Sequence, residues 1–206
     1  GGTSVEDIGN QLGVQWGRFA FDAAFPGPQN EKPTLYLHPC SMWHTPPDVL
    51  AAYRKQLAKG SRKQAAAARA IQVYSQAQAI FCTVRHPYTR AVSQYKHMLQ
   101  FLAAGHRVDL RIRPSLELGC SEAGLNRFVK AFVRNMERDP WQMDCHTVPQ
   151  ERYISGLAGQ RRWCTEQLRT DNLVEDFNAL MARYSLDIRM TPQMHSKDGS
   201  SYCNVT

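Results

Sequence analysis

The chain has 206 residues, of which 43% are hydrophobic and 21% charged, and its 25 Lys and Arg residues outnumber its 18 Asp and Glu residues to give a net charge of +7. This length fits one domain with a sizeable core and argues against two full domains, and the composition is that of an ordinary soluble globular protein. No run approaches the roughly 18 apolar residues that a membrane span needs. The basic surplus favours an anionic ligand, which leaves nucleic acid, an acidic glycan and a phosphate-rich cofactor open.

The first predicted element is an amphipathic helix over residues 4–16, in which apolar side chains recur about once per turn. Thr3 or Ser4 would cap this helix. Gly1 and Gly2 come just before it, and glycines let backbone N–H groups close on an anion that the helix dipole also attracts. The start has neither the charge nor the apolar segment of a signal peptide. The sequence therefore predicts either an anion-binding turn or a cloning remnant followed by an ordinary capped helix.

Two histidines lie between the next two predicted elements. A loop at residues 26–32 leads to a short strand at residues 34–38, and a second helix begins with two prolines and covers residues 46–53. His38 ends the strand and His44 precedes the helix. Histidine titrates near neutral pH and suits general-base catalysis, to which a positioned base typically contributes roughly 10²–10⁴-fold. A single histidine is more often structural, so these residues alone leave both roles open.

The most informative stretch is a buried strand followed by a helix. The strand is predicted over residues 79–84, after a basic, alanine-rich helix with a solvated face at residues 60–69, and the next helix covers residues 87–102. Arg85 ends the strand and Ser93 lies on the second turn of the helix. Both side chains can converge on one phosphate through charge-assisted hydrogen bonds. A structural arginine on a strand–helix turn is the alternative.

The rest of the chain continues the alternation of strands and helices. An arginine-containing excursion, a helix, an irregular segment, a strand and a last helix are predicted at residues 103–120, 125–136, 141–150, 162–168 and 172–184. This alternation predicts an α/β fold with a mostly parallel sheet. The excursion would lie at the mouth of a binding site.

The six cysteines permit disulfides; they are Cys40, Cys82, Cys120, Cys145, Cys164 and Cys203. None forms a CxxC pair, which argues against a structural zinc site. Cys82 lies inside the apolar strand and is interpreted as a small buried residue. Cys145 and Cys164 flank a predicted loop of about 20 residues and are the predicted disulfide, which would stabilise the fold by roughly 3 kcal/mol. Together with an N-glycosylation sequon at residues 204–206, disulfides favour a lumenal or extracellular compartment.

Residues 84–95 resemble the 3′-phosphate-binding element of sulfotransferases, which use 3′-phosphoadenosine-5′-phosphosulfate (PAPS) as sulfonate donor. In that family a strand ending in V-R-[DNH]-P is followed by an aromatic residue, an arginine and a serine near S-x-Y. This chain matches the pattern nearly position by position, from Val84 to Tyr95. The resemblance implies that Arg85 and Ser93 bind the 3′-phosphate of the cofactor.

Both ends of the chain resemble further parts of the family's cofactor site. Residues 1–4 resemble the end of the 5′-phosphosulfate loop, where a lysine and a glycine or two precede Thr or Ser and a helix, and this implies that they bind the 5′-phosphosulfate. The family's lysine lies just upstream, so the chain is expected to begin inside this loop. Ser196 and Lys197 fall where the family often has an Asn-x-Ser segment near the cofactor, and both are predicted to contact it.

Two more segments resemble glycan sulfotransferases of the membrane-bound Golgi type. Their catalytic base is a His or Glu just after the strand that follows the phosphosulfate loop, which implies His44 as the base and His38 as the second choice. Residues 146–150 resemble the family's H-x-x-P-Q segment, and residues 170–177 resemble the E-x-L-x-x-D-F that follows it. The residues implied to line the acceptor or cofactor cleft are Trp43, His146, Gln150 and Arg152. A polar loop held by hydrogen bonds is the alternative for the 146–150 segment.

The resemblance covers nearly the whole chain and implies one PAPS-dependent sulfotransferase domain over residues 1–206. The implied fold is a P-loop-like three-layer α/β fold, whose central, mostly parallel sheet is flanked by helices and binds PAPS across the C-terminal ends of its strands. Sulfonate transfer to a glycan hydroxyl would leave PAP and need no metal. The expected compartment is the Golgi lumen, with any membrane anchor in a segment before residue 1. The rivals are a basic nucleic-acid-binding domain, although no nucleic-acid motif is present, and an inactive PAP-binding relative that serves as an interaction module.

Overall fold

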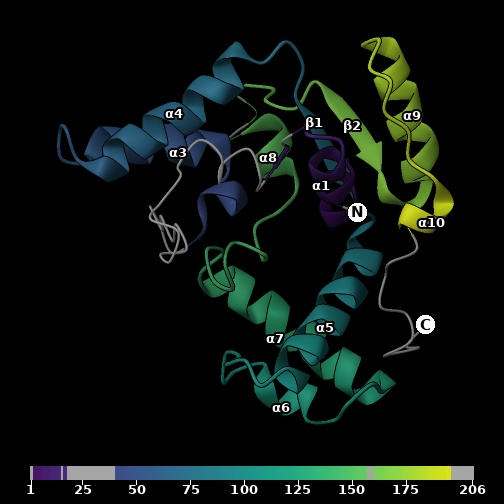
Figure 1. The fold of residues 1–206 in the computed structure, drawn as a ribbon. Coiled ribbons are helices and arrows are strands. Elements are labelled where there is room, and N and C mark those ends of the chain that lie inside the picture. Colours follow the sequence, from purple (N-terminus) through teal and green to yellow (C-terminus); the bar gives the residue numbers. More distant parts are fainter. Residues whose placement is uncertain (1, 15, 18–39, 157–158, 160, 196–206) are drawn as a thin grey trace.

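The computed structural model describes residues 2–14, 16–17, 40–156, 159 and 161–195 (Figure 1). In this part of the chain, helices surround a small parallel sheet of two strands. Strand β1 (Phe81–Val84) pairs with β2 (Glu166–Arg169) so that the first residues of the two strands lie opposite each other, as do the last. The parallel pairing agrees with the α/β character expected from the sequence. The predicted strand at residues 34–38 lies outside the described residues.

Helices account for most of the described chain. In order they are α1 (Gly2–Gln11), η1 (Met42–His44), α3 (Pro47–Gln56), α4 (Arg62–Gln76), α5 (Pro87–Ala103), α6 (Arg113–Leu116), α7 (Glu122–Arg138), α8 (Glu151–Ser155), η3 (Thr170–Asn172), α9 (Leu173–Arg183) and α10 (Pro192–His195). The predicted helices near α3, α4, α5, α7 and α9 are confirmed. The short helices α6 and α8 fall outside the predicted set, because four or five residues are too few to show a helical period.

The first helix differs from its predicted bounds at both ends. It begins at Gly2, so Thr3 and Ser4 lie in its first turn rather than at its cap, and it ends at Gln11 rather than near Trp16. The early end follows from Gly13, whose φ of 73° is left-handed and therefore available to glycine at little cost. The chain then turns back, and the Trp16 ring meets the edge of Phe81 on β1 with 5.5 Å between ring centroids.

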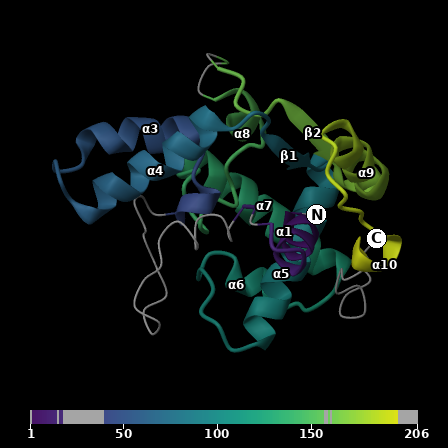
Figure 2. The ribbon, with the colours of Figure 1, turned by 45° about the horizontal axis from the view of Figure 1, so that its top comes forward.

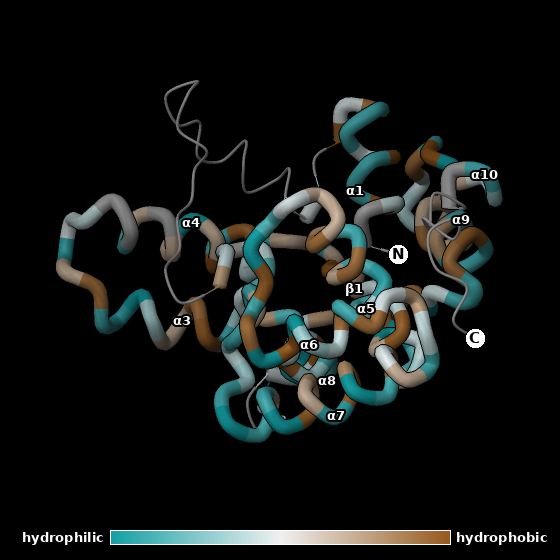
Figure 3. The backbone as a smooth tube through the Cα atoms, turned by 90° about the horizontal axis from the view of Figure 1, so that it is seen from below, coloured by the Kyte–Doolittle hydropathy of each residue, from teal (hydrophilic) through white to brown (hydrophobic). Residues whose placement is uncertain are grey.

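Three groups of buried apolar side chains hold the helices in place. One joins α1, β2 and α9, and its members include Val5, Ile8, Leu168, Leu173, Phe177 and Leu180. A second joins α5, α6 and α7 through Tyr95, Leu99, Ile112, Leu116 and Phe128. The third lies between α3 and α4, which run side by side in both views (Figures 1 and 2). Along α7, hydrophilic and hydrophobic segments alternate, as expected of a helix with one apolar face (Figure 3).

Helix α4 is less solvated than its basic, alanine-rich sequence suggests. Ala67 and Ala70 are fully buried and pack on Leu50 of α3, so one face of α4 belongs to the core. Small side chains on this face let the two helices approach closely. Ser61 caps α4 by accepting a hydrogen bond from the backbone N–H of Gln64.

Two disulfides connect distant parts of the chain, and they correct the predicted pairing. Cys40 is bonded to Cys145, and Cys82 is bonded to Cys164. The predicted bridge between Cys145 and Cys164 is therefore wrong, and Cys82 is not a free buried thiol. The parallel pairing of β1 and β2 explains this, because it brings Cys164 beside Cys82, with 5.9 Å between their Cα atoms. Cys120 is also disulfide-bonded.

The structure agrees with the predicted parallel sheet between helices, but only the coarse part of the predicted three-layer arrangement is present in the described residues. Helices flank a parallel sheet, but the sheet within the described residues has two strands, whereas a three-layer α/β fold has helices on both faces of a wider sheet. None of the described helices combines the length and the apolar character needed to cross a bilayer.

Candidate functional site

The carboxyl end of β1 is fixed by the side chain of Gln150. The backbone N–H of Arg85 donates to Gln150 Oε1 over 2.9 Å, and Gln150 Nε2 donates to the carbonyl oxygen of Arg85 over 2.7 Å. This pair of hydrogen bonds attaches the strand end to the 141–150 segment. It favours the reading of the H-x-x-P-Q segment as a loop held by hydrogen bonds, since the Gln150 amide is already engaged. A substrate-binding role for Gln150 stays a prediction.

Replacing Gln150 by alanine is expected to lower the free energy of unfolding by about 2 kcal/mol, because two partly buried backbone groups of Arg85 lose their partners. Urea denaturation followed by circular dichroism measures this loss. Gln100→Ala on α5 is the matched control, since that side chain is exposed. Equal stability of the two variants would show that the Gln150 amide does not hold the strand end.

The guanidinium of Arg85 is half-buried and available to an anion. Its Nε donates to Thr170 Oγ1 over 3.3 Å, and no carboxylate of the described residues pairs with it. In contrast, Arg169 at the end of β2 forms an ion pair with Asp176. The Ser93 hydroxyl, two turns into α5, has no hydrogen-bond partner within the described part of the chain. Arg85 and Ser93 thus keep free donors, as the phosphate-binding prediction requires.

The 141–148 segment is anchored to α5 by a half-buried arginine. Arg90 Nη2 donates to the carbonyl oxygens of His146 and Val148, over 2.8 and 2.9 Å. Burial lowers the pKa of this guanidinium, and the nearby Tyr153 opposes that shift. The arginine of the family-like pattern therefore has a structural task, which is to position the loop that carries His146.

Three successive residues of this segment have left-handed backbone conformations. The φ angles of Met143, Asp144 and Cys145 are 52°, 54° and 63°. Such angles are uncommon for residues other than glycine, and each one costs about 1–3 kcal/mol, so it persists only where the surroundings impose it. The Cys40–Cys145 disulfide and the Arg90 contacts impose it here. The tight turn brings the Asp144 carboxylate back toward residues 41–44.

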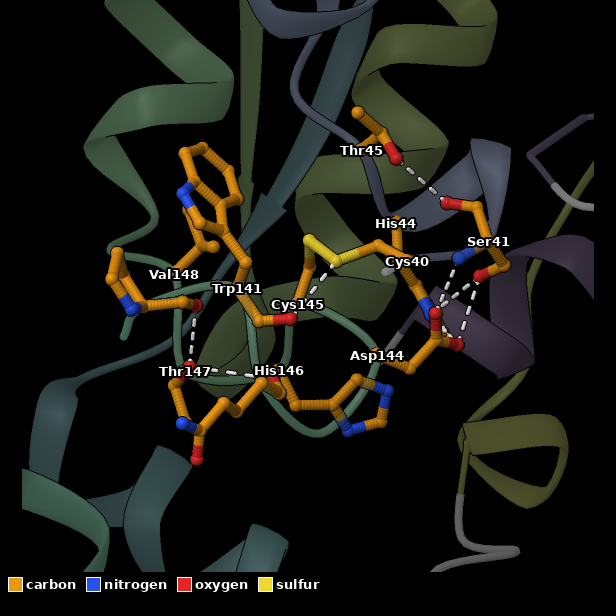
Figure 4. The surroundings of a disulfide bond; sticks show 12 residues. Cys40, Ser41, His44, Thr45, Trp141, Asp144, Cys145, His146, Thr147 and Val148 are labelled. Atoms are coloured by element: carbon orange, nitrogen blue, oxygen red, sulfur yellow. Dashed lines mark hydrogen bonds and ion pairs between the residues drawn. A yellow bond between two sulfur atoms is a disulfide. The ribbon is translucent and has the colours of Figure 1, made fainter. Parts of the chain in front are cut away.

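Asp144, Ser41 and His44 form a hydrogen-bonded group beside the Cys40–Cys145 disulfide (Figure 4). His44 Nδ1 lies 2.7 Å from Asp144 Oδ2, and the Ser41 hydroxyl donates to the same oxygen over 2.8 Å. The backbone N–H of Ser41 donates to Asp144 Oδ1. Burial raises the pKa of Asp144, but the hydrogen bonds from His44 and Ser41 outweigh it and hold that pKa below its usual value. The carboxylate is therefore ionised at neutral pH.

The contact with Asp144 decides which nitrogen of His44 is basic. An ionised carboxylate only accepts hydrogen bonds, so Nδ1 of His44 carries the proton and Nε2 keeps a lone pair. About a third of each side chain is exposed, 37% for His44 and 34% for Asp144, which gives a substrate access. Ser41 lies 3.0 Å from Nδ1 rather than beside Nε2, the position that a nucleophilic serine takes in a hydrolytic triad. The group is therefore suited to proton abstraction by His44 and not to acylation of Ser41.

Two more histidines gather around His44. The His146 ring meets it edge-on, with 4.6 Å between centroids, and the His97 ring lies 6.1 Å from that of His146. Burial, and to a smaller degree the nearby His44, lowers the pKa of His146 to about 4. The same two causes, desolvation first, lower the pKa of His97. His146 Nδ1 donates to Gln94 Oε1 over 3.1 Å, which fixes the orientation of the ring.

Several members of this site were not predicted from the sequence. Ser41, Asp144, Arg90, Gln94 and His97 all contribute to it. Three of them could have been found from the sequence: Arg90, Gln94 and His97 are spaced at i, i+4 and i+7, which places them on one face of α5. Asp144 has no comparable signal, since it lies 100 residues from His44 in the sequence.

The two remaining residues predicted to bind substrate are Trp43 and Arg152, and Tyr153, which was not predicted, also contacts this region. Trp43 stacks edge-on against His44, with 5.9 Å between centroids. The Tyr153 hydroxyl donates to the carbonyl oxygen of His44 over 2.7 Å and so supports η1. Arg152 pairs with Asp48 and lies over the Trp141 ring, so it connects α8 to α3 and the loop.

Only some of the residues predicted to bind the cofactor at the chain ends lie within the described part of the chain. Gly1, Ser196 and Lys197 lie outside the described residues, as does His38, the second choice for the catalytic base. Helix α1 begins at Gly2, so Gly2, Thr3 and Ser4 lie in its first turn, and their contact with the 5′-phosphosulfate stays a prediction.

Comparison with protein-family models, with curated proteins and with solved structures found no match to this chain. The function is therefore argued from the residues themselves. The geometry offers a histidine, His44, that is oriented by an ionised carboxylate, and an arginine at the end of a parallel strand that pairs with no carboxylate of the described residues.

Proposed function

We propose that this protein is a PAPS-dependent sulfotransferase that transfers a sulfonate group to a hydroxyl of a glycan. The observation that carries the proposal is the pairing of His44 with Asp144, which fixes the proton on Nδ1 and leaves Nε2 to accept another. The proposal includes a P-loop-like three-layer α/β fold, supported by the parallel pairing of β1 and β2.

The proposed reaction assigns one task to each group of the site. The acceptor oxygen attacks the sulfur, the new O–S bond forms as the bond between sulfur and the 5′-phosphate oxygen breaks, and PAP leaves. His44 Nε2 takes the hydroxyl proton, and the negative charge of Asp144 stabilises the resulting imidazolium. A base positioned in this way typically contributes roughly 10²–10⁴-fold to the rate. Trp43 and His146, whose rings flank His44, are proposed to contact the acceptor.

The donor is proposed to lie across the carboxyl ends of the strands. There the free donors of Arg85 and Ser93 would bind the 3′-phosphate of PAPS. Residues 1–4 would bind the 5′-phosphosulfate at the start of α1, where backbone N–H groups and the helix dipole favour an anion. Ser196 and Lys197 complete the proposed cofactor contacts. The net charge of +7 suits both an anionic donor and an anionic glycan.

The proposed compartment is the Golgi lumen. Disulfides form and persist in oxidising compartments, and this chain has Cys40–Cys145 and Cys82–Cys164. Sulfation of a glycan would take place on the same side of the membrane.

Binding of PAP to the wild-type protein and to Arg85→Ala tests the donor site by isothermal titration calorimetry. We expect the variant to bind PAP at least tenfold more weakly, since it loses a charge-assisted contact that contributes about 1.5–3 kcal/mol. Arg127→Ala is the matched control: it removes the same charge from an exposed position of α7. Equal PAP affinity of Arg85→Ala and the control would overturn the donor assignment.

A sulfonate-transfer assay with radiolabelled PAPS and a panel of neutral and anionic glycans tests the reaction. Label transfer to a glycan supports the proposal. PAP binding without transfer to any acceptor would identify an inactive relative. Nucleic-acid binding with a steep salt dependence, and no affinity for PAP, would identify the basic nucleic-acid-binding domain instead.

A further inference from the structure

The histidine site also has the composition of a metal centre. One nitrogen of His44, one nitrogen of His146 and one oxygen of Asp144 all lie within 4.8 Å of one another. Two imidazoles and a carboxylate are a recurrent ligand set for transition metals that keep an open coordination position. We propose that His44, Asp144 and His146 bind a divalent zinc ion.

The distances between the ligand atoms are close to what one ion requires. Ligands about 2.0–2.2 Å from a tetrahedral zinc lie roughly 3.4 Å apart. His44 Nδ1 and Asp144 Oδ2 are 2.7 Å apart, so zinc would take the place of the proton between them. A ligand atom of His146 lies within 4.8 Å of the other two, so a shift of its ring on the order of 1 Å would bring it to the spacing of a zinc ligand.

The ligands are oriented from outside, as metal ligands commonly are. The Gln94 amide oxygen accepts the Nδ1 proton of His146, which leaves Nε2 of that ring free to bind an ion. The Ser41 hydroxyl and backbone N–H hold the two oxygens of Asp144. Outer hydrogen-bond partners of this kind fix the orientation of the ligands.

Zinc is favoured over other ions by the surroundings of the site. The nearest cysteines, Cys40 and Cys145, are joined in a disulfide and offer no thiolate for copper(I) or an iron–sulfur cluster. Zinc has no redox chemistry, and it accepts two imidazoles, a carboxylate and one water.

Zinc bound at this place would inhibit the proposed sulfonate transfer. A neutral imidazole carries one proton, so a metal on Nδ1 of His44 forces the proton onto Nε2 and removes the basic lone pair. This consequence rests on the proposed function, whereas zinc binding itself does not. The rate of the proposed sulfonate transfer would then fall as the free zinc concentration rises.

Titration of the purified protein with zinc chloride at neutral pH, in the absence of PAPS, tests the binding by calorimetry. We expect one zinc per chain, about 100-fold weaker binding by His146→Ala and by Asp144→Asn, and about 10–100-fold weaker binding by Gln94→Ala. His106→Ala is the control, because His106 is an exposed histidine stacked on Phe101. Circular dichroism of each variant without zinc verifies that it is folded.

A second measurement does not depend on any variant. Long-range ¹H–¹⁵N NMR of the wild-type histidines reports the protonated nitrogen of His44, and zinc should move the proton from Nδ1 to Nε2. Absence of zinc binding, binding that His146→Ala and Asp144→Asn leave unchanged, or an unaltered His44 tautomer would each overturn the proposal. Zinc binding is read without the donor, so it can succeed or fail independently of PAP binding.

Discussion

Replacing Asp144 by asparagine should lower the turnover number of sulfonate transfer by roughly 10²–10⁴-fold. The asparagine keeps the shape of the side chain but removes the negative charge that stabilises the His44 imidazolium. Its amide can also donate to Nδ1 of His44, which would place the imidazole proton on Nε2. The basic lone pair of His44 would then face the introduced amide rather than the acceptor.

The division of this effect between kcat and KM distinguishes catalysis from binding. Steady-state kinetics with PAPS and a glycan acceptor should show the loss in kcat, with the KM for PAPS unchanged, because Asp144 is proposed to act through His44 and not on the donor. Asp187→Asn is the matched control at an exposed position. If Asp144→Asn retains most of the wild-type kcat, the assignment of His44 as a base oriented by Asp144 is wrong.

The Cys40–Cys145 disulfide should make a large contribution to stability and an additional contribution to activity. It joins residues 105 apart in the sequence, and in the chain-entropy model a loop of that size is worth roughly 4–5 kcal/mol. Its two cysteines directly adjoin Ser41 and Asp144. The double variant Cys40→Ala/Cys145→Ala should therefore lose stability and release Asp144 from His44, which lowers kcat.

A second double variant separates the two effects. Cys82→Ala/Cys164→Ala removes a bridge of 82 residues and should lose a comparable amount of stability, but that bridge joins β1 to the residues before β2 and contacts neither His44 nor Asp144. Urea denaturation gives the stability of each variant, and kcat is measured at a temperature where all remain folded. Equal losses of kcat in the two double variants would show that the Cys40–Cys145 bridge has no special part in orienting the site.

The regular elements were predictable where the local signal is strong. Proline in the first turn and a clear apolar period locate α3 and α5, and four apolar side chains on one face locate α9. The end of α1 was not predictable in the same way, because the apolar period continues past Gly13 while the backbone does not. Here a single residue with φ of 73° overrides the pattern.

The candidate site was predictable only in part, for a reason that lies in its construction. His44 and His146 attract notice as histidines near recognisable segments. Their partner Asp144 stands in a turn of left-handed residues that has no glycine, and a disulfide between distant cysteines brings it to Ser41. Neither the turn nor the pairing of Cys40 with Cys145 follows from local sequence.

The long separation of His44 and Asp144 also bears on how the protein is made. Contacts between residues 100 apart form late in folding, because the entropy of closing so large a loop must be overcome before the contact contributes. During synthesis, the segment with His44 emerges from the ribosome well before its partner. At about 5–20 residues per second, the delay between them is roughly 5–20 seconds. A nascent chain therefore lacks the contact between His44 and Asp144 until the loop between them has been closed and the Cys40–Cys145 disulfide has formed.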